Sequence, residues 1–288
     1  MKLTNLLLTS MLSLACTSVY AGNFVNLTNG NGTNLTTANG GLQTGTTNPL
    51  ADRFYLETTS ATFLPGLDPS NSSGEVVASS INYRSFTGGT TNSNSVLTLL
   101  DWRVTENVPL LTGIPQATIY DFVYRDSADN KLVFATRYLN EVDNNQEANY
   151  LYRYGFSGYT AAAAWTFSTN DDLRLYQSGL TSDYTYNSSV AYDADTVRQK
   201  SDISVSEGNP WTGLFLVKTN AEYYTFGDKA IGFYQAGEEG QSVVGGYIGG
   251  FVASSTGPVT PVPEPETYAM MLAGLGMVGW MARRRKSI

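Results

Sequence analysis

A hydrophobic pattern with a period of two most constrains the fold of this 288-residue chain. In one run, four aromatic residues alternate with other side chains, as they do along a strand: Tyr150, Tyr152, Tyr154 and Phe156. Other short runs, at 119–124, 131–139 and 214–217, are rich in aromatic and β-branched residues, which pack well on a pleated surface. No amphipathic helical segment of ordinary length stands out, and only 160–167 is ambiguous. The sequence therefore predicts an all-β fold.

Clusters of Asp, Asn, Gly, Ser and Pro separate these runs, as expected for turns between strands. The cluster at 126–130 divides residues 118–140 into a predicted hairpin. Roughly ten to fourteen runs lie between residues 52 and 252, a spacing typical of two-layered or closed all-β folds. We predict a single jelly-roll-like β-sandwich domain over residues 52–254, flanked by an N-terminal signal helix and a C-terminal transmembrane helix. A domain of this length can bury a core without disulfides.

The absence of histidine and the presence of a single cysteine, Cys16, narrow the possible chemistry. Without His, the chain cannot build Ser-His-Asp or Cys-His nucleophilic sites or His-ligated zinc. One Cys allows neither an intrachain disulfide nor a thiolate cluster. Charged residues make up only 15% of the chain, below the roughly 25% of ordinary soluble domains. These features favour an exported binding or structural protein over an enzyme.

The N-terminus has the parts of a secretory signal. Lys2 is the only charge in the first 51 residues, and residues 3–15 are mainly Leu, Met, Ala, Ser and Thr. Small or modest residues at the −3 and −1 positions predict cleavage after Ala21, so residues 1–21 form the signal peptide. Two alternatives stay open. One is lipidation of Cys16 at a poorly matching lipobox, and the other is an uncleaved anchor, although the apolar run falls short of the roughly 20 residues of a span.

The C-terminus combines a polar motif, an apolar run and a basic cluster. The motif is Pro263, Glu264 and Pro265, the apolar run covers 267–282, and four basic residues follow: Arg283, Arg284, Arg285 and Lys286. Basic residues at the end of an apolar helix stop transfer and stay in the cytoplasm, which leaves everything upstream outside. The sequence predicts a transmembrane helix over 267–282, slightly short for a hydrocarbon core of ~30 Å.

This tail resembles the PEP-CTERM sorting signal of exported proteins in Gram-negative bacteria, many of which make exopolysaccharide. The resemblance covers 261–288 and implies that an exosortase in the inner membrane recognises the Pro263, Glu264 and Pro265 motif and processes the precursor. It implies nothing about the body, because many unrelated bodies carry such tails. The alternative is a plain single-pass anchor in which the three residues occur by chance.

The body between the two ends is strongly acidic. Lys2, the four terminal basic residues and two tail glutamates lie outside 22–262. Of 25 acidic and 17 basic side chains, the body therefore keeps 23 and 12, a net charge of −11. A surface of this charge repels phosphates, so no nucleic-acid partner is predicted.

Two stretches flank the predicted domain. Residues 22–51 contain no charged side chain and are rich in Asn, Gly and Thr. They are predicted to form a low-complexity leader, either flexible or loosely β-like. Residues 255–262 are predicted to link the domain to the sorting tail, 263–288.

Enzymatic activity is not predicted, although glycoside hydrolysis needs two carboxylates and no histidine. Three candidate pairs lie close in sequence: Asp121/Asp126, Glu141/Asp143 and Asp171/Asp172. Pairs must occur by chance among so many carboxylates, and the sequence places no two of them the ~5–10 Å apart that the reaction requires. A carboxylate-based, carbohydrate-active enzyme on a β-sandwich scaffold is the alternative function.

No cofactor and no metal site are predicted, with a structural calcium ion as the open alternative. Oxygen ligands of the kind that Ca²⁺ prefers gather in three predicted loops: Asp126/Asp129/Asn130, Asp143/Asn144/Asn145/Glu147 and Asp193/Asp195. None has the spacing of an EF-hand loop, and ordinary turn chemistry also explains Asp and Asn at these positions.

Aromatic residues, 12% of the chain, suit either a core or a sugar-binding surface. Exposed Tyr and Trp can stack on sugar rings, and the body contains Trp102, Trp165 and Trp211. The simpler interpretation of the 150–156 run is that its Tyr and Phe build the sandwich core and cross-strand pairs. The prediction is a non-catalytic surface or extracellular-matrix protein associated with exopolysaccharide or biofilm. It would reside in the inner membrane as a precursor and then reach the cell surface or the medium.

Overall fold

The computed structural model describes residues 24–27, 35–36, 56–64, 77–87, 90–111, 114–141, 148–166, 175, 177–180, 194–203, 211–235 and 244–257. All regular elements in these ranges are strands and none is a helix, so the predicted all-β class is confirmed. Accordingly, these ranges contain no helix with the length and apolarity of a membrane span. The predicted signal helix and the predicted transmembrane helix at 267–282 lie outside them.

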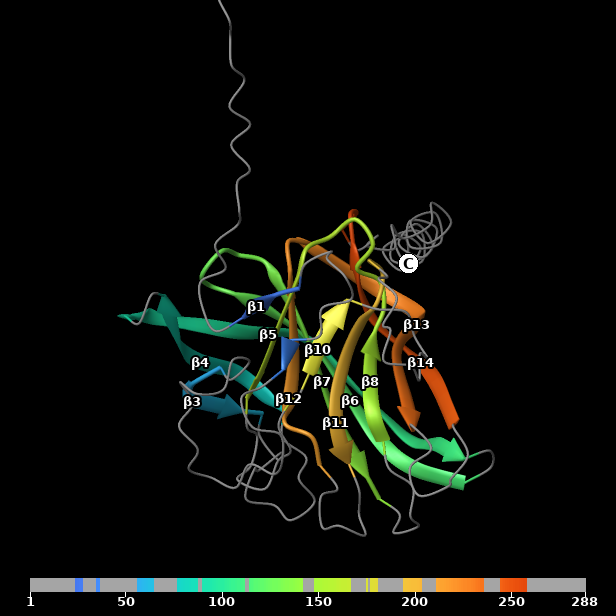
Figure 1. Ribbon diagram of the computed structural model, residues 1–288. Coiled ribbons are helices and arrows are strands. Elements are labelled where there is room, and N and C mark those ends of the chain that lie inside the picture. The colour runs from blue at the N-terminus through green and yellow to red at the C-terminus, as the bar shows by residue number, and fades with distance from the viewer. Residues whose placement is uncertain are drawn as a thin grey trace, which may run out of the picture.

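The strands form two antiparallel sheets (Figure 1). The eight-stranded sheet has the order β1 (Val25–Asn26), β9 (Ala161–Thr166), β12 (Leu214–Thr219), β7 (Leu132–Asn140), β6 (Ile114–Asp126), β5 (Thr90–Leu111), β4 (Ala78–Thr87) and β3 (Thr58–Phe63). The six-stranded sheet has the order β14 (Val244–Ser254), β13 (Tyr223–Gln235), β8 (Ala148–Arg153), β11 (Val197–Ile203), β10 (Gln177–Leu180) and β2 (Leu35–Thr36). Strands β3 to β7 are neighbours in chain order, which makes this part a meander rather than the paired Greek keys of a jelly roll.

The predicted hairpin at 118–140 is confirmed as β6 and β7. Its turn closes through main-chain hydrogen bonds from the Asn130 N–H to the Asp126 carbonyl, 2.8 Å, and from the Asp126 N–H to the Lys131 carbonyl, 2.9 Å. The Asp126 carboxylate also accepts the Ala128 N–H at 2.9 Å, the local hydrogen bond that makes Asp a turn residue. Asn130 adopts a positive φ of 60°, which Asn tolerates better than most residues.

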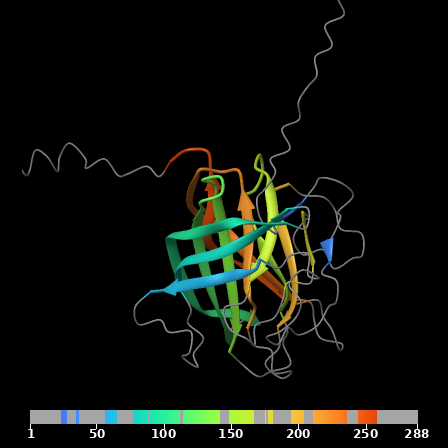
Figure 2. The same cartoon turned by 90° about the vertical axis from the view of Figure 1, so that its left-hand side faces the viewer.

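The eight-stranded sheet curls until its two ends meet. Leu56, just before β3, donates its N–H to the carbonyl of Trp165 in β9 at 2.8 Å, although β3 is at one end of the sheet order and β9 is next to β1 at the other end. Figure 2 shows β3, β4 and β5 crossing in front of the other strands. The curl encloses one hydrophobic cluster, which includes Tyr83, Phe122 and Leu216. The second and larger cluster contains residues of both sheets, among them Phe134, Phe215 and Leu151.

The ambiguous segment at 160–167 forms strand β9. Ala161, Ala163 and Trp165 belong to the cluster shared by the two sheets, whereas Ala162 and Ala164 belong to the cluster inside the curl. Because both faces of β9 are buried, the strand reads as a continuous apolar run of mostly small residues rather than as an alternation.

Parts of the predicted leader join the fold. Strand β1 pairs with β9 at one edge of the larger sheet, and β2 pairs with β10 at one edge of the smaller sheet. Phe24 and Leu27, which flank β1, are buried in the two hydrophobic clusters. The predicted domain boundaries at 52 and 254 stay predictions.

Burial raises the pKa of three tyrosines, Tyr83, Tyr124 and Tyr138, above the ordinary value of 10.0. Their hydroxyls stay protonated in the fold, whereas in the unfolded chain they ionise near the ordinary value. The stability they contribute is therefore complete below about pH 10 and is lost as the pH rises further. We expect the phenolate absorbance of these residues to appear together with the loss of near-ultraviolet circular dichroism. Ionisation of all tyrosines before any loss of structure would contradict this expectation.

Candidate functional site

The outward side of the six-stranded sheet carries a group of tyrosines and basic residues. Leu151 and Arg153 of β8 point toward the other sheet, so Tyr150 and Tyr152, which alternate with them, point outward. The strand register extends this side across the sheet in two rows: Tyr247, Gly232, Tyr152 and Arg198, then Tyr234, Tyr150 and Lys200. We call this side, together with Tyr154 and Lys229, the tyrosine face.

The prediction that the 150–156 run lines the sandwich core is wrong for its tyrosines, whereas the predicted cross-strand pairing is confirmed for Tyr150, which lies opposite Tyr234. Tyr152, Tyr154 and Tyr234 form a separate cluster, with Tyr150 packed against it, and only Phe156 belongs to the core shared by the sheets. Phe156 changes side because Gly155 has a φ of 89°, a left-handed conformation that glycine adopts without strain. The tyrosine rings lie against one another, with centroid distances of 6.1–6.5 Å.

The basic side chains of the tyrosine face lie over its rings. Lys229 Nζ is 4.2 Å from the ring centroid of Tyr154 and 5.3 Å from that of Tyr247, so it bridges the two rings. The Arg198 guanidinium lies 5.1 Å from the Tyr150 centroid. Burial lowers the pKa of Arg198, a group that nevertheless stays charged in proteins. Positive charge is thus held against aromatic rings within a strongly acidic body.

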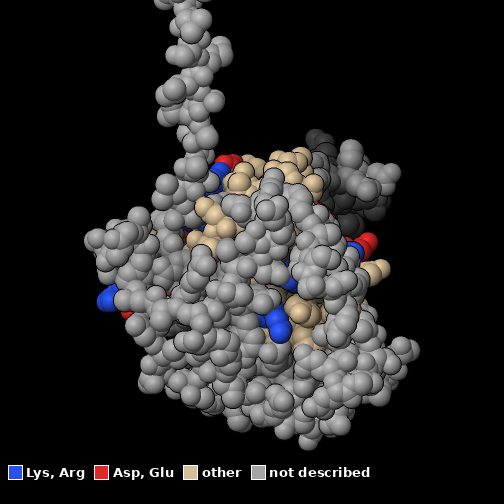
Figure 3. All heavy atoms as spheres, in the orientation of Figure 1, with Lys and Arg blue, Asp and Glu red and all other residues tan. Residues whose placement is uncertain are grey.

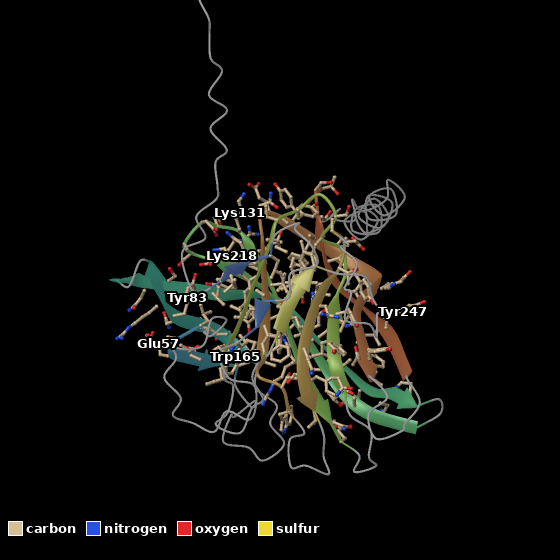
Figure 4. All side chains as sticks on the ribbon, viewed as in Figure 1. Glu57, Tyr83, Lys131, Trp165, Lys218 and Tyr247 are labelled. Atoms are coloured by element: carbon tan, nitrogen blue, oxygen red, sulfur yellow. The ribbon has the colours of Figure 1, made fainter. Side chains whose placement is uncertain are left out.

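Exposure is concentrated at one end of this face. The Tyr247 side chain is 56% exposed and Lys229 is exposed, whereas Tyr152, Tyr154 and Arg198 are buried. Figure 4 places Tyr247 on the side of β13 and β14. Figure 3, drawn in the orientation of Figure 1, shows atoms of Lys and Arg next to atoms of uncharged residues. This end of the tyrosine face can therefore present an aromatic ring, Tyr247, and a cation, Lys229, to a ligand with no change in the conformation of the protein.

Sequence reasoning missed the basic half of this face. Arg198 and Lys200 lie two residues apart in β11, so the same period of two that revealed the tyrosines places them on one side of the sheet. Lys229 gives no such signal because a register shift between Gly227 and Ile231 interrupts the alternation of β13.

The candidate carboxylates Asp121 and Asp126 do not form a catalytic pair. They are five positions apart, an odd number, so they lie on opposite sides of β6, and each is bound to its own cation. Asp121 is 2.5 Å from the Arg153 guanidinium and accepts the Phe251 N–H at 2.7 Å. Burial raises the pKa of the Asp121 carboxyl, and Arg153 opposes that effect.

The Arg153–Asp121 pair joins the two sheets. Besides Asp121 of β6, the Arg153 guanidinium donates to the Thr136 hydroxyl of β7 at 3.0 Å and to the Phe251 carbonyl of β14 at 2.8 Å. Gly250 makes room for this contact, since a Cβ there would collide with the Asp121 carboxylate. Four strands therefore meet at one buried ion pair.

The first calcium candidate instead surrounds an ammonium group. Lys218 Nζ of β12 lies 2.6 Å from Asp126 Oδ2 and 2.9 Å from Asp129 Oδ2. The Tyr83 hydroxyl donates to the same Asp126 oxygen at 2.7 Å. The described ranges hold no group of three or more acidic or cysteine side chains spaced to bind a metal ion.

The remaining candidates are scattered or lie outside the described residues. Glu141 accepts the Thr118 hydroxyl, and Asp195 accepts the Ser157 N–H. Trp165 is buried, Trp102 is exposed, and the Arg137 guanidinium covers the Trp211 ring at 4.1 Å. The structure does not describe residues 142–147, which hold the second calcium group and Asp143, nor the candidates Asp171, Asp172 and Asp193. It also does not describe the predicted cleavage site, the sorting motif or the basic stop: Ala21, Pro263, Glu264, Pro265, Arg283, Arg284, Arg285 and Lys286.

Comparison with known proteins bears on the tail alone. No curated protein and no solved structure matches the chain. Residues 261–286 match the family model of the PEP-CTERM protein-sorting motif, which confirms the resemblance seen in the sequence. This motif implies export, passage of the precursor through a membrane and processing by an exosortase. The chain therefore carries a C-terminal PEP-CTERM sorting motif, which implies an exported protein sorted by an exosortase.

Proposed function

We propose that the mature protein is a non-catalytic component of the cell surface or extracellular matrix that binds exopolysaccharide through the exposed end of the tyrosine face. Cleavage after Ala21 and retention of 267–282 in the inner membrane would precede exosortase processing. The sorting motif supports the destination, since it sends the body away from the cytoplasm.

The observation that carries the binding proposal is the contact of Lys229 with both Tyr154 and Tyr247. A tyrosine ring offers an apolar surface to the C–H faces of a sugar and a hydroxyl at its edge. A lysine held beside it attracts carboxylate or sulfate groups on an acidic polysaccharide. The body has a net charge of −11, so a cation at this position reduces the repulsion that such a chain meets there.

The absence of catalysis is supported by the state of the central carboxylates. Glycoside hydrolysis needs two carboxyl groups that flank one bond, one of them able to give up a proton. Asp121 and Asp126 are instead buried, separated by the sheet and neutralised by Arg153 and Lys218.

Retention of the purified protein on exopolysaccharide from its own producing cells tests the proposal. Tyr247→Ala and Lys229→Ala are each expected to weaken retention about tenfold, because each removes a contact of about 1–2 kcal/mol. Raising the salt concentration should weaken wild-type retention further, since exposed charges are screened.

Tyr223→Ala is the matched control. Tyr223 of β13 is an exposed tyrosine like Tyr247 of β14, with 43% of its surface exposed, but it pairs with Ser254 at the far end of β14. Its retention should equal that of the wild type. Equal retention of Tyr247→Ala and wild type, or no retention of either, would overturn the binding proposal and leave a purely structural role.

A further inference from the structure

The buried cluster around Lys218 has the composition of a bond-forming site. Lys218 and Asp126 are both fully buried, with 0% of either side chain exposed, and Lys218 Nζ lies 2.6 Å from Oδ2 of the Asp126 carboxylate. The cluster lies inside the curl of the larger sheet, beside the Phe24 ring, 5.5 Å from Nζ. Figure 4 places Lys218 and Tyr83 on the opposite side of the molecule from Tyr247, so this site is separate from the tyrosine face.

We propose that Lys218 and Asp126 condense spontaneously to form an intramolecular amide cross-link. The lysine nitrogen forms a bond with Cγ of Asp126, and the bond between Cγ and Oδ2 breaks. Oδ2 leaves as water with two of the three ammonium protons, and the third stays on the amide nitrogen. An ammonium and a carboxylate thus become a neutral amide and water, with no change of oxidation state and no cofactor.

Three neighbouring groups serve the three needs of this reaction. Asp129 Oδ2, 2.9 Å from Nζ, can accept a proton from the ammonium, which frees the nitrogen lone pair. The Ala128 N–H, 2.9 Å from Oδ1, stabilises the negative charge on the oxygen that remains. The Tyr83 hydroxyl, 2.7 Å from Oδ2, supports the oxygen that leaves.

Tyr83 can act only as a donor at this site. Burial and the neighbouring Asp126 charge raise the pKa of its hydroxyl, so the group keeps its proton. At the end of the reaction Asp129 and Tyr83 have the protonation states with which they began. Both are therefore catalytic residues of a single-turnover reaction within the chain.

Burial favours the product. Burying two charges costs desolvation free energy, which their mutual attraction offsets only in part. A neutral amide does not carry this cost. Neither side chain is exposed to bulk solvent, so the amide is also shielded from hydrolysis once the released water has left.

The Arg153–Asp121 pair provides an internal comparison. It is almost as deeply buried, with 1% and 2% of its side chains exposed. However, the guanidinium is delocalised and always protonated, so it does not serve as a nucleophile. One buried pair of this fold is expected to condense, and the other is expected to stay ionic.

The cross-link would stabilise the fold of an exported body that has no disulfide. It would join β12 to the end of β6 across 92 positions of the chain, with β7 between them in the sheet. A covalent closure of a long loop restricts the unfolded chain and so favours the fold. Cys16 lies in the predicted signal peptide, so the body has no cysteine for this purpose.

Mass spectrometry of the full-length protein tests the proposal. After denaturation and proteolysis, we expect one joined product that contains Asp126 and Lys218, lighter by one water than the two peptides together. Asp121 and Arg153 should appear in separate peptides. The readout is at the peptide level, so processing of the chain ends does not affect it. Recovery of the Asp126 and Lys218 peptides only in separate, unmodified form would overturn the proposal.

Asp129→Asn tests the proton acceptor without opening the core, because Asp129 is 34% exposed and its other oxygen, which accepts the Lys131 N–H, is retained in Asn. The joined fraction at a fixed time after synthesis is expected to fall about a hundredfold. Lys218→Arg keeps the charge and should give no joined product, which identifies the nitrogen. An unchanged joined fraction in Asp129→Asn would contradict the role assigned to Asp129.

Discussion

Asp121→Ala is expected to lower the free energy of unfolding by about 3–5 kcal/mol, because it leaves the buried Arg153 guanidinium without its counter-charge. Arg153 cannot turn toward water to compensate, since only 1% of its side chain is exposed. The Phe251 N–H also loses its acceptor. Urea unfolding at equilibrium measures the decrease. A variant that does not accumulate as folded protein would correspond to the largest expected decrease.

The matched control is a salt bridge on the surface. Lys131 and Glu222 lie 2.6 Å apart, about as close as the buried pair, but the Glu222 side chain is 58% exposed. Exposed pairs of this kind contribute little because water and salt screen them. Glu222→Ala should therefore unfold at the same urea concentration as the wild type. If both variants unfold together, the buried pair does not hold the two sheets in the way described here.

Replacing Pro263 and Glu264 together with alanine is expected to abolish release of the mature protein and to leave the precursor in the inner membrane. The motif at 261–286 implies recognition by an exosortase. The predicted apolar helix at 267–282 and the basic residues after it would still stop transfer, so the unprocessed chain would stay in the membrane. Cell fractionation with an antibody against the body distinguishes precursor from released protein.

Glu266→Ala is the control for this experiment. Glu266 is the next acidic residue of the tail but lies outside the Pro263, Glu264 and Pro265 motif, so the variant should be released like the wild type. Release of the double variant at the wild-type level would show that these two residues do not direct sorting. It would leave the tail as an ordinary membrane anchor.

Local patterns predicted the secondary structure well where strands are half-exposed or end at turn residues. The hairpin of β6 and β7 follows from two apolar runs around a turn at 126–130, and its register follows from that turn. The alternation at 150–156 correctly marked β8, but it did not show which side faces the core. That choice depended on Leu151 and Arg153, because the other sheet packs against them.

Pairings between distant residues lay beyond any local pattern. Asp126 is the turn residue that the sequence predicted. Its local pattern also suggested a calcium ligand or half of a catalytic pair, and it did not show that the carboxylate is buried against Lys218, 92 positions away. The tyrosine face likewise combines β8, β11, β13 and β14, which come together only when the smaller sheet forms.

The sequence by itself determined that this protein carries a sorting motif, which implies export, and that its body is built of strands. A sorting motif is a contiguous run of residues, and the period of a strand is set by neighbouring residues, so both can be recognised without a fold. Only the tertiary structure decided which side of β8 became the tyrosine face and which cation each buried carboxylate met. Faces and ion pairs are made by strands far apart in the chain, and their packing is a property of the whole fold.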